Sequence, residues 1–432
     1  MSIKSWGNFQ TKPNKLISFS SRSELLSILA EKKQIIPRGN GKSYGDSSLN
    51  DQIINTLNRN IFINFDRKTG ILNCQSGVLL DDIINIFVPL GWFLNVTPGT
   101  KFITVGGAIA SDVHGKNHHL VGTFSNFVLS FNLAMPDGNI LQCSSTENKT
   151  LFQATCGGMG LTGVILDAKI QLRRIPSALM EQMTIKTKNL EETLQVFERY
   201  KNASYSVAWI DCLTRKKSLG RGLFMSGEHA DAGGFDFQQK RKLTVPINFP
   251  SFSFNFFSAK LFNMLYYHKG NSSYIKQKIS IDSFFYPLDQ INHWNRIYGK
   301  SGLIQYQFVL PKKNSLLGMR AILNKISDAK KVGFLAVLKL FGKSNQNYLS
   351  FPIKGYTLAI DFRREPDLFP LLEQLDKIVV EYGGRIYLAK DCRISKKIFE
   401  QGYPNIQLFR DIRKKYHLNE SLSSFQSQRI DI

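Results

Sequence analysis

The sequence predicts an α+β protein with two domains, and three observations support this fold class. The chain has 432 residues, which is enough for two or three domains that each bury a core. Its first 175 residues combine short β-type runs, one or two helices and many glycines. The region from 302 to 390 instead alternates strands and helices in the order βαββαβ, which is the split βαβ arrangement.

In the N-terminal part, residues 70–78 predict a strand followed by a turn. A helix is expected next, because the apolar residues recur at helical spacing before Pro89 and Gly91 end it: Leu80, Ile83, Ile84 and Phe87. Two further strands flank the turn at 136–138. Alternation of Ala168, Ile170 and Leu172 with polar residues predicts one more strand.

The stretch from about 215 to 282 is aromatic, basic and irregular, and it supports no element assignment. After it, strands are expected at 302–310, 333–342, 355–362 and 385–390, and helices at 313–329 and 366–384. The second helix has one apolar face and ends at Gly383 and Gly384, with the face formed by Leu368, Leu371, Leu372, Leu375, Ile378 and Val379.

The composition indicates a globular, reducing-compartment protein. The five cysteines are scattered and form no CxxC pair, so neither a disulfide framework nor a thiolate zinc site is expected. No apolar run reaches the roughly eighteen residues of a membrane-spanning helix, and no leader pattern is found at the N-terminus. We therefore expect a cytoplasmic protein.

The net charge of +23 favours an anionic partner, such as a phosphorylated ligand or an anionic membrane face. The basic clusters are short and dispersed, so nucleic acid is not expected as a partner. A merely solvated basic surface explains the charge equally well.

Three glycine-rich segments carry the chemical signal: "PRGNGKSYGDSSLN" (37–50), "TPGTKFITVGGAIASDVHGKNHH" (97–119) and "CGGMGLTGVI" (156–165). Glycine lets backbone N–H groups converge on phosphate oxygens and lets a ligand touch the main chain. The first segment matches neither the dinucleotide-binding fingerprint nor the Walker A motif. Each segment alone could be a plain turn, but together they predict a long phosphorylated ligand.

The order of these segments resembles that of the flavin oxidases of the vanillyl-alcohol oxidase type. Within this family it is most similar to the oxidase subunits of decaprenylphosphoryl-β-D-ribose 2′-epimerases, and the similarity extends through "YSVAWID" (205–211) and "LKLFG" (338–342) to "GGRIYLAKDCR" (383–393). The resemblance implies a two-domain fold: an FAD-binding domain at 1–178, a substrate domain at 179–384 that covers the flavin, and a segment at 385–432 that returns to the first domain.

The resemblance also implies which residues bind FAD. They are Arg38, Gly39, Asn40, Gly41, Lys42, Ser43, Tyr44, Pro98, Gly99, Thr100, Thr104, Val105, Gly106, Gly107, Ala110, Ser111, His114, Gly115, Asn117, Gly160, Gly163, Val164 and Ile165. Related oxidases often carry a flavin-linked histidine where this chain has Lys42, so non-covalent FAD is expected.

The three histidines at 114, 118 and 119 could be interpreted as a metal site, but no Asp, Glu or Cys set accompanies them, and no metal is expected. The resemblance makes His114 an active-site residue beside the flavin, whereas a buried histidine satisfied by its neighbours is the alternative. His118 and His119 are expected to be structural.

Oxidation of a secondary alcohol needs a group that takes the hydroxyl proton and a cation that makes the flavin a better acceptor. The resemblance makes Lys390, at the end of the last predicted strand, the first candidate for an essential residue, with His114 and Tyr44 on the flavin side. Gln305 and Gln307 lie two residues apart on one strand, so their side chains share a face of the sheet. These two glutamines and Lys339 are expected to contact the substrate. Without the resemblance, the two glutamines could equally lie on an exposed sheet face. Lys339 stands in an apolar strand, which suggests a paired, functional charge.

The activity implied by the resemblance is oxidation of the 2′-hydroxyl of a polyprenyl-phosphoryl-β-D-ribose to the 2′-keto intermediate of epimerisation to arabinose, in cell-surface polysaccharide biosynthesis. A short-chain dehydrogenase-type reductase partner and peripheral contact with the inner membrane face are expected with it. Two alternatives remain: an oxidase of a free sugar, alditol or aldonolactone, and a basic binding protein for nucleic acid or membrane on a vestigial flavin fold.

Overall fold

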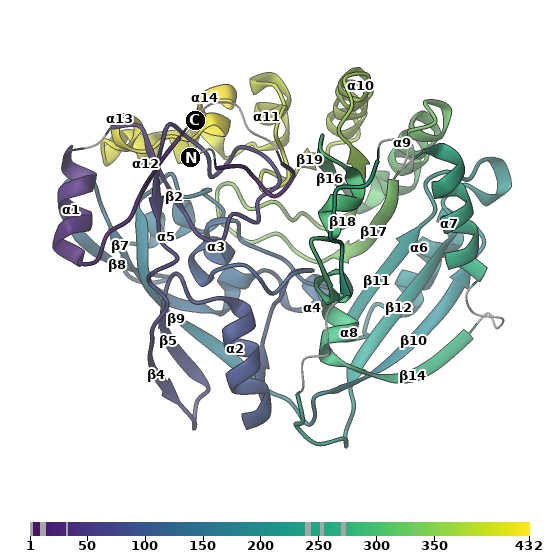
Figure 1. Ribbon diagram of the computed structural model, residues 1–432, viewed down its shortest axis with the longest axis horizontal. Helices are drawn as coiled ribbons and strands as arrows, with labels where there is room; N and C mark the ends of the chain where they lie inside the picture. Colours follow the sequence, from purple (N-terminus) through teal and green to yellow (C-terminus); the bar gives the residue numbers. More distant parts are fainter. Residues whose placement is uncertain are drawn as a thin grey trace.

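The computed structural model describes residues 3–8, 14–31, 33–237, 243–250, 255–268, 274–331 and 333–432. Its helices and strands form two main parts, which Figure 1 shows side by side. The purple-to-blue N-terminal part and the yellow C-terminal helices lie on one side, and a large sheet in teal and green lies on the other. The chain therefore mixes helices and sheets, as the predicted α+β class requires.

The N-terminal part is built on two sheets. A parallel sheet has the order β1 (Lys15–Ile17), β3 (Gln52–Asn55) and β2 (Ile35–Arg38), next to α1 (Arg22–Glu31). A six-stranded antiparallel sheet has the order β4 (Phe62–Asp66), β5 (Ile71–Gln75), β9 (Val164–Arg174), β7 (Val128–Ala134) and β8 (Ile140–Ser144), with β6 (Trp92–Leu94) also paired to β9. The strands expected around 70–78, 136–138 and 168–172 are all present.

Helix α2 (Leu80–Phe87) buries the four apolar residues that predicted it. The helix is followed by a short 3₁₀ turn at Val88–Leu90. The chain then changes direction at Gly91, which has a φ of 78°. Two shorter helices follow: α3 (Val105–Ala110), which lies in the glycine-rich segment and contains Gly106 and Gly107, and α4 (His118–Val121), which begins at the end of that segment. Helix α5 (Lys149–Thr155) comes directly before the third glycine-rich segment, at 156–165.

The large sheet has eight strands and consists of two units with the same order of elements. One unit runs β10 (Leu179–Thr187), α6 (Leu190–Arg199), β11 (Tyr205–Ile210), β12 (Gly222–His229), α7 (Phe256–His268) and β14 (Tyr274–Ser280). The other runs β16 (Leu303–Pro311), α9 (Ser315–Asp328), β17 (Gly333–Phe341), β18 (Gly355–Arg363), α10 (Leu368–Glu381) and β19 (Arg385–Ile386). The predicted split βαβ arrangement is present in the second unit, whereas the first unit was not predicted.

The two units join edge to edge. The sheet order is β14-β10-β12-β11-β17-β18-β16-β19, all neighbouring pairs are antiparallel, and β11 pairs with β17 where the units meet. In each unit the strands follow the same spatial order, with the fourth beside the first and the third beside the second. The short helix α8 (Ile281–Phe285) leads from the first unit to the irregular segment before β16.

The structure corrects the expected last strand at 385–390. Strand β19 ends at Ile386, because the N–H groups of Lys390 and Asp391 both bond to the carbonyl of Tyr387 and turn the chain away from the sheet. The carbonyl of Ala389 then accepts the N–H of Tyr44 at 3.1 Å, which attaches this turn to the N-terminal part. Lys390 thus lies in a turn and not on a strand, and the eight-stranded sheet extends two residues past the expected boundary at 384.

After this turn, the C-terminal helices return to the N-terminal part: α11 (Lys396–Gly402), α12 (Ile406–Lys415), α13 (Leu418–Ser421) and α14 (Phe425–Ile430). Arg429 on α14 bridges two buried carboxylates, at 2.8 Å from Asp46 and 2.8 Å from Asp391. Gln426 donates to the carbonyl of Leu388 at 2.8 Å. The C-terminal segment therefore holds the turn that carries Lys390.

Candidate active site

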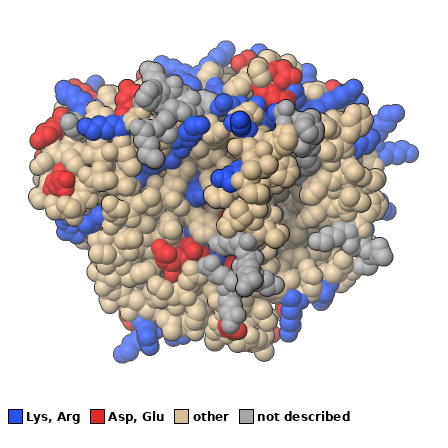
Figure 2. Space-filling view, viewed as in Figure 1, with Lys and Arg blue, Asp and Glu red and all other residues tan. Residues whose placement is uncertain are grey.

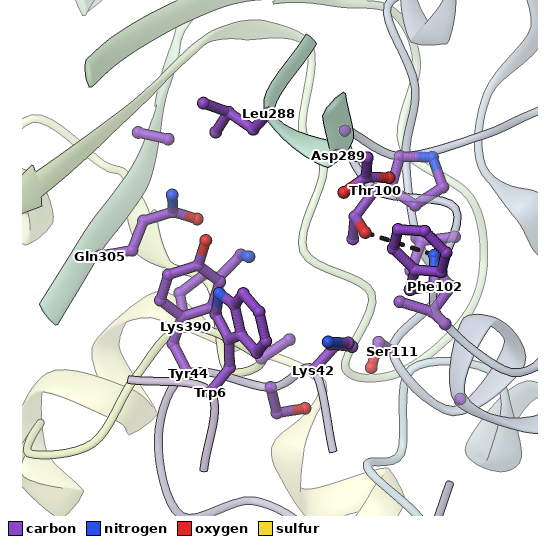
Figure 3. Close-up of a pocket in the computed structure, with 18 of the residues that line it drawn as sticks. Trp6, Lys42, Tyr44, Thr100, Phe102, Ser111, Leu288, Asp289, Gln305 and Lys390 are labelled. Carbon is purple, nitrogen blue, oxygen red and sulfur yellow. Dashed lines mark hydrogen bonds between the residues drawn. The ribbon is translucent and has the colours of Figure 1, made fainter. Parts of the chain in front are cut away.

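A cavity of ≈ 930 Å³ lies where the glycine-rich segments meet the eight-stranded sheet. Its volume is near the upper end of the roughly 300–1,000 Å³ of small-molecule sites. Figure 3 shows Tyr44, Trp6, Gln305 and Lys390 on one side of this space and Thr100, Phe102 and Asp289 on the other. The cavity is thus bounded by both parts of the chain.

Most of the predicted site residues line this cavity. All six predicted catalytic and substrate residues do so: Lys390, His114, Tyr44, Gln305, Gln307 and Lys339. Of the predicted cofactor residues, those on the cavity wall are Arg38, Gly39, Asn40, Gly41, Lys42, Ser43, Tyr44, Pro98, Gly99, Thr100, Thr104, Gly106, Gly107, Ala110, Ser111, His114, Gly160, Gly163 and Ile165.

Four predicted cofactor residues do not line the cavity. Val105 and Val164 are completely buried at the starts of α3 and β9. The Asn117 side chain donates to the carbonyl of Asn95 at 2.7 Å. A Cβ on Gly115 would lie 2.8 Å from the carbonyl oxygen of Thr97. All four pack against protein atoms and support the wall from behind.

The glycines of the wall explain why the cavity can hold a large ligand. Gly41 has a φ of +60°, which disfavours side chains, and a Cβ there would lie 2.0 Å from Nη2 of Arg38. At Gly39, a Cβ would lie 2.3 Å from Oγ1 of Thr104. That hydroxyl also accepts the N–H of Gly107 at the start of α3. Gly99 faces open space, so any side chain there would occupy the cavity.

Two buried polar atoms on the wall also fit a bound ligand. Ser76 Oγ and His114 Nδ1 have no hydrogen-bond partner among the described atoms, and both residues line the cavity. Buried polar groups are rarely left unpaired in native proteins. The glycine wall, the volume and these two atoms together fit the FAD that the resemblance implies.

Lys390 is in contact with Tyr44 and belongs to a buried polar cluster. Its Nζ lies 3.8 Å from the centre of the Tyr44 ring. The Tyr44 hydroxyl is hydrogen-bonded to Trp6 and Gln305, and the Gln305 amide donates to Asp361 Oδ1 at 2.5 Å. Burial lowers the pKa of Lys390, while the negative charge of Asp361 opposes that shift. Burial likewise raises the pKa of the Asp361 carboxyl.

His114 is oriented by Gln307. The Gln307 amide nitrogen lies 3.1 Å from His114 Nε2 and 3.2 Å from Thr357 Oγ1. An amide nitrogen only donates, so Nε2 accepts and the neutral ring carries its proton on Nδ1. Burial, with the positive charges of Lys339 and Lys390 adding to it, holds the pKa of His114 well below its usual range. His114 therefore presents a neutral imidazole with an unpaired Nδ1–H.

The other two histidines of the segment have structural contacts. His118 Nδ1 accepts the N–H of Gly342 at 3.1 Å, and His119 Nε2 lies 2.9 Å from the carbonyl of Ala203. Within the described ranges, no group of three His, Cys, Asp or Glu side chains could hold a metal ion. The contacts agree with the structural role expected for His118 and His119.

Five cations line the cavity: Arg38, Lys42, Lys116, Lys339 and Lys390. Burial lowers the pKa of Lys42 and of Lys339 to about 8, of Lys116 to about 7, and of Arg38 to about 10. A ligand with phosphate groups would compensate this charge. On the face shown in Figure 2, Lys and Arg lie mainly in the upper part and are interspersed with Asp and Glu. The cavity instead brings five cations around one space, which makes it a strong candidate anion site.

Asp289 is an acidic residue on the wall that the sequence did not single out. Its Oδ2 accepts the N–H of Lys101 at 2.8 Å, and burial raises its pKa to about 6. Lys101 is itself buried and bridges Asp81 at 3.0 Å and Asp282 at 2.8 Å. This network joins the 97–119 segment to the segment around α8, so it fixes one side of the cavity.

Other wall residues were also missed. Trp6, Trp209 and Lys116 line the cavity, and Asp361 lies behind Gln305. A signal was present for Asp361, because it is a carboxylate in an apolar strand, just as Lys339 is a lysine in one. Trp209 carried no such signal, since a tryptophan in an apolar strand is usually a core residue. Trp6 stands in a polar stretch at 4–8, which by itself indicates no ligand.

Comparisons with known proteins identify the N-terminal part. Residues 16–144 match the sequence profile of the family described as "FAD binding domain". Decaprenylphosphoryl-β-D-ribose oxidase of Mycolicibacterium smegmatis is 34% identical over 412 residues, which cover 92% of this chain and 89% of that protein.

More distant relatives match either a part of the chain or most of its length. L-gulonolactone oxidase of Mus musculus is 25% identical over 92% of this chain and 90% of its own length. Delta(24)-sterol reductase of Homo sapiens is 28% identical over 120 residues, which is 26% of this chain and 23% of the reductase. The mycobacterial and the mouse relative, which each match over 92% of this chain, are both named oxidases.

Proposed function

The chain belongs to the family of FAD-dependent oxidases that includes decaprenylphosphoryl-β-D-ribose oxidase, and from this premise we propose that its substrate is a polyprenyl-phosphoryl-β-D-ribose. The protein is an FAD-dependent oxidoreductase that acts on a CH–OH group. The proposed reaction converts the 2′-hydroxyl of the ribose to a 2′-keto group. One observation carries the assignment: Gln305, Gln307 and Lys339 of the large sheet share one cavity with the glycine-rich wall and Lys390.

The cavity residues divide into two groups by their chemistry. The wall formed by 38–44, 98–107 and 160–165 offers backbone N–H groups and space, which suits the pyrophosphate and ring system of FAD. The amides of Gln305 and Gln307 offer donors and acceptors for ribose hydroxyls, and Lys339 offers a cation for the substrate phosphate.

Oxidation of a secondary alcohol removes the hydroxyl proton together with a hydrogen and its electron pair from carbon, and bound FAD supplies the acceptor for that pair. In our proposal, Lys390 Nζ takes the hydroxyl proton. Burial lowers the pKa of this lysine, so the neutral amine with its free lone pair is accessible near neutral pH. Tyr44 holds Nζ against its ring, and the neutral His114 supplies the unpaired Nδ1–H as a hydrogen-bond donor.

We also propose that the FAD is bound non-covalently. Lys42 stands where related oxidases carry the flavin-linked histidine, and its Nζ lies 3.7 Å from the centre of the Trp6 ring. A lysine in that position offers no imidazole for attachment. Its positive charge is instead placed on the cavity wall.

Two further parts of the proposal follow from the reaction. A 2′-keto sugar becomes the epimer only after reduction, so a separate reductase of the short-chain dehydrogenase type must consume the product. A polyprenyl chain keeps the substrate in a bilayer, so the enzyme is proposed to work at the cytoplasmic membrane face. Among the described residues, no helix is both long and apolar enough to span a membrane, and the proposed contact is peripheral.

Spectroscopy of the purified protein tests these proposals. The expected spectrum has oxidised-flavin bands that acid precipitation releases into the supernatant, and anaerobic polyprenyl-phosphoryl ribose bleaches them. Flavin that stays in the pellet would refute non-covalent binding. Bleaching by free sugars or aldonolactones, and not by the phosphorylated substrate, would move the assignment toward the activity named for the gulonolactone relative.

A further inference from the structure

Helix α7 (Phe256–His268) is apolar around most of its circumference, which is unusual for a helix at a protein surface. Five of its thirteen residues are large apolar side chains with exposed fractions between 46% and 80%: Phe257, Leu261, Phe262, Met264 and Leu265. Four of them, Phe257, Leu261, Met264 and Leu265, recur at helical spacing and therefore form one continuous stripe. We call these four residues the α7 stripe.

The opposite side of α7 is anchored to the large sheet. Asn263 is buried and donates to Asp211 Oδ1 at 2.8 Å, and Ala259 is also buried. The Tyr266 ring packs 4.9 Å from the ring of Trp209, and both residues line the cavity. The helix is therefore docked through one face, with the α7 stripe turned outward and the cavity wall beside it. Figure 1 shows α7 at the right-hand side of the large sheet, away from the six-stranded sheet.

A comparison with α10 makes the exposure of this helix more informative. Helix α7 follows the third strand of its βαββαβ unit in chain order, as α10 does in the second unit, but the two helices lie on opposite faces of the sheet. Tyr266 of α7 packs on Trp209 of the cavity face, whereas Asp376 of α10 accepts the hydroxyl of Tyr306 on the other face. Helix α10 packs against α9 and buries Leu368, Leu371, Leu372, Leu375 and Val379. Helix α7 has comparable apolar content, but its packing leaves the α7 stripe in solvent. Helix α10 thus uses its apolar residues for burial, whereas α7 presents an apolar face on the side of the sheet that carries the cavity.

The charges around α7 select the kind of partner. The helix contains Lys260 and no Asp or Glu. On its flank, Lys186 Nζ lies 5.6 Å from the centre of the Tyr267 ring. Arg221 lies 4.4 Å from the same ring but is paired with the buried Asp211 at 3.0 Å. An apolar face flanked by cations complements a bilayer with anionic headgroups.

We propose that the α7 stripe inserts into the surface of an anionic lipid bilayer and thereby places the cavity at the membrane that carries the substrate. This inference rests on the proposed function for its purpose, because a polyprenyl substrate resides in the bilayer. Helices of this kind lie in the interface with their apolar side buried by about 5–10 Å. Tyr266, on the docked side of α7, lines the cavity, so the helix that would contact the bilayer also contributes to the cavity wall.

Vesicle flotation of the FAD-loaded enzyme tests the proposal. The probe is a vesicle of phosphatidylglycerol and phosphatidylethanolamine, compared with neutral phosphatidylcholine vesicles. The test variant combines Phe257→Ser, Leu261→Ser and Leu265→Ser. The three native side chains are exposed, so their replacement should change the free energy of unfolding little. The matched control combines Ile61→Ser, Ile63→Ser and Leu90→Ser, which are exposed apolar residues of the N-terminal part. We expect the wild type and the control to float with anionic vesicles and the test variant to lose at least tenfold in partitioning.

Activity measurements separate this inference from the proposed function. With a short, water-soluble prenyl-phosphoryl ribose, all three proteins should react equally, whereas with long-chain substrate in vesicles only the test variant should slow. If no phosphorylated ribose reacts but flotation still depends on the α7 stripe, the proposed function fails and the docking surface stands. Wild-type enzyme that stays off anionic vesicles, or a test variant that floats like wild type, overturns the inference. A dimer that the test variant dissociates, without vesicle binding, would overturn it in favour of a second copy of the chain.

Discussion

The Nζ atom of Lys390 lies 3.8 Å from the centre of the Tyr44 ring, although the two residues are 346 positions apart in the chain. Lys390 comes from the turn after β19, and Tyr44 lies in the glycine-rich segment at 37–50, after β2. The N–H of Tyr44 bonds to the carbonyl of Ala389, so the main chains are attached at the same place. The electron-rich face of an aromatic ring attracts a cation, and this attraction offsets part of the hydration that a buried ammonium group loses. This contact keeps the amine at the cavity wall while burial lowers its pKa.

Replacing the amine should abolish most of the turnover without loss of cofactor. For Lys390→Met we expect kcat to fall by about 10²- to 10⁴-fold, the range typical of a lost general base. Flavin content, measured from the visible spectrum, should stay at the wild-type level. Lys325→Met, on the exposed side of α9, is the control and should leave kcat unchanged. A Lys390→Met enzyme with near-normal turnover would exclude the lysine as the proton acceptor.

The charge of Asp361 should appear in the pH profile. The neutral amine is the reactive form in our proposal, so kcat/KM should rise with pH through the lowered pKa of Lys390. Asp361 opposes that lowering, and therefore Asp361→Asn should move the rising limb to lower pH. The measurement is kcat/KM from pH 5 to 9 for both proteins. A limb that falls with pH would instead show that Lys390 acts as a cation, and an unmoved limb would contradict the coupling.

Lys339 should distinguish phosphorylated from free sugar. A hydrogen bond to a charged group contributes about 1.5–3 kcal/mol, which corresponds to roughly 10- to 100-fold in affinity. We expect Lys339→Met to raise KM for the phosphorylated substrate by that factor, with little change for any free sugar that reacts. Steady-state kinetics on both substrates provide the test. Equal losses on both would assign Lys339 to a general role in the cavity.

Lys116 should make the FAD-free protein more stable at higher pH. Its pKa is lowered to about 7 by burial, whereas an unfolded lysine titrates near about 10.4. Between these values the unfolded chain binds more protons, so the free energy of unfolding rises with pH. Lys116→Met should reduce this slope by up to about 1.4 kcal/mol per pH unit. Urea denaturation at pH 7 and pH 9 measures it, and an unchanged slope would show that the lysine stays solvated.

Arg429 should stabilise the turn that carries Lys390. Its partners Asp46 and Asp391 have side chains only 4% and 1% exposed, so Arg429→Met leaves two buried carboxylates without their cation. Breaking a buried pair in this way costs about 3–5 kcal/mol. Lys396→Met removes the exposed pair with Asp431 and should cost about 1 kcal/mol or less. Denaturation midpoints compare the two variants, and equal losses would contradict the clamp.

Local patterns in the sequence were enough to predict many of the elements. The spacing of Leu80, Ile83, Ile84 and Phe87 predicted α2, and the apolar face of 368–379 predicted α10, because helical periodicity is a short-range property. The first βαββαβ unit was not predicted, because it lacks such a clear periodic signal in its second helix. Its counterpart helix α7 has apolar residues on two sides, so no single face stands out between 256 and 268.

The glycine-rich segments and the lysine of "AVLKLFG" could also be recognised as functional from the sequence, because glycine clusters and a charge in an apolar strand are unfavourable without a purpose. The resemblance then indicated FAD as the ligand that the three segments together bind. Local sequence could not show that Val105, Gly115, Asn117 and Val164 lie behind the wall, since side-chain direction depends on packing.

By itself, the sequence determined the fold class, the helices with one clear apolar face, and which residue types were candidates for the site. Only the tertiary structure decided that Lys390 lies in a turn against Tyr44, that Asp361 stands behind Gln305, and that Asp289 is held by Lys101. These contacts join residues far apart in the chain, and their energies depend on burial that arises when the sheets and loops pack together. Periodicity describes neighbours along the chain, whereas the pKa and pairing of a buried charge depend on neighbours in space.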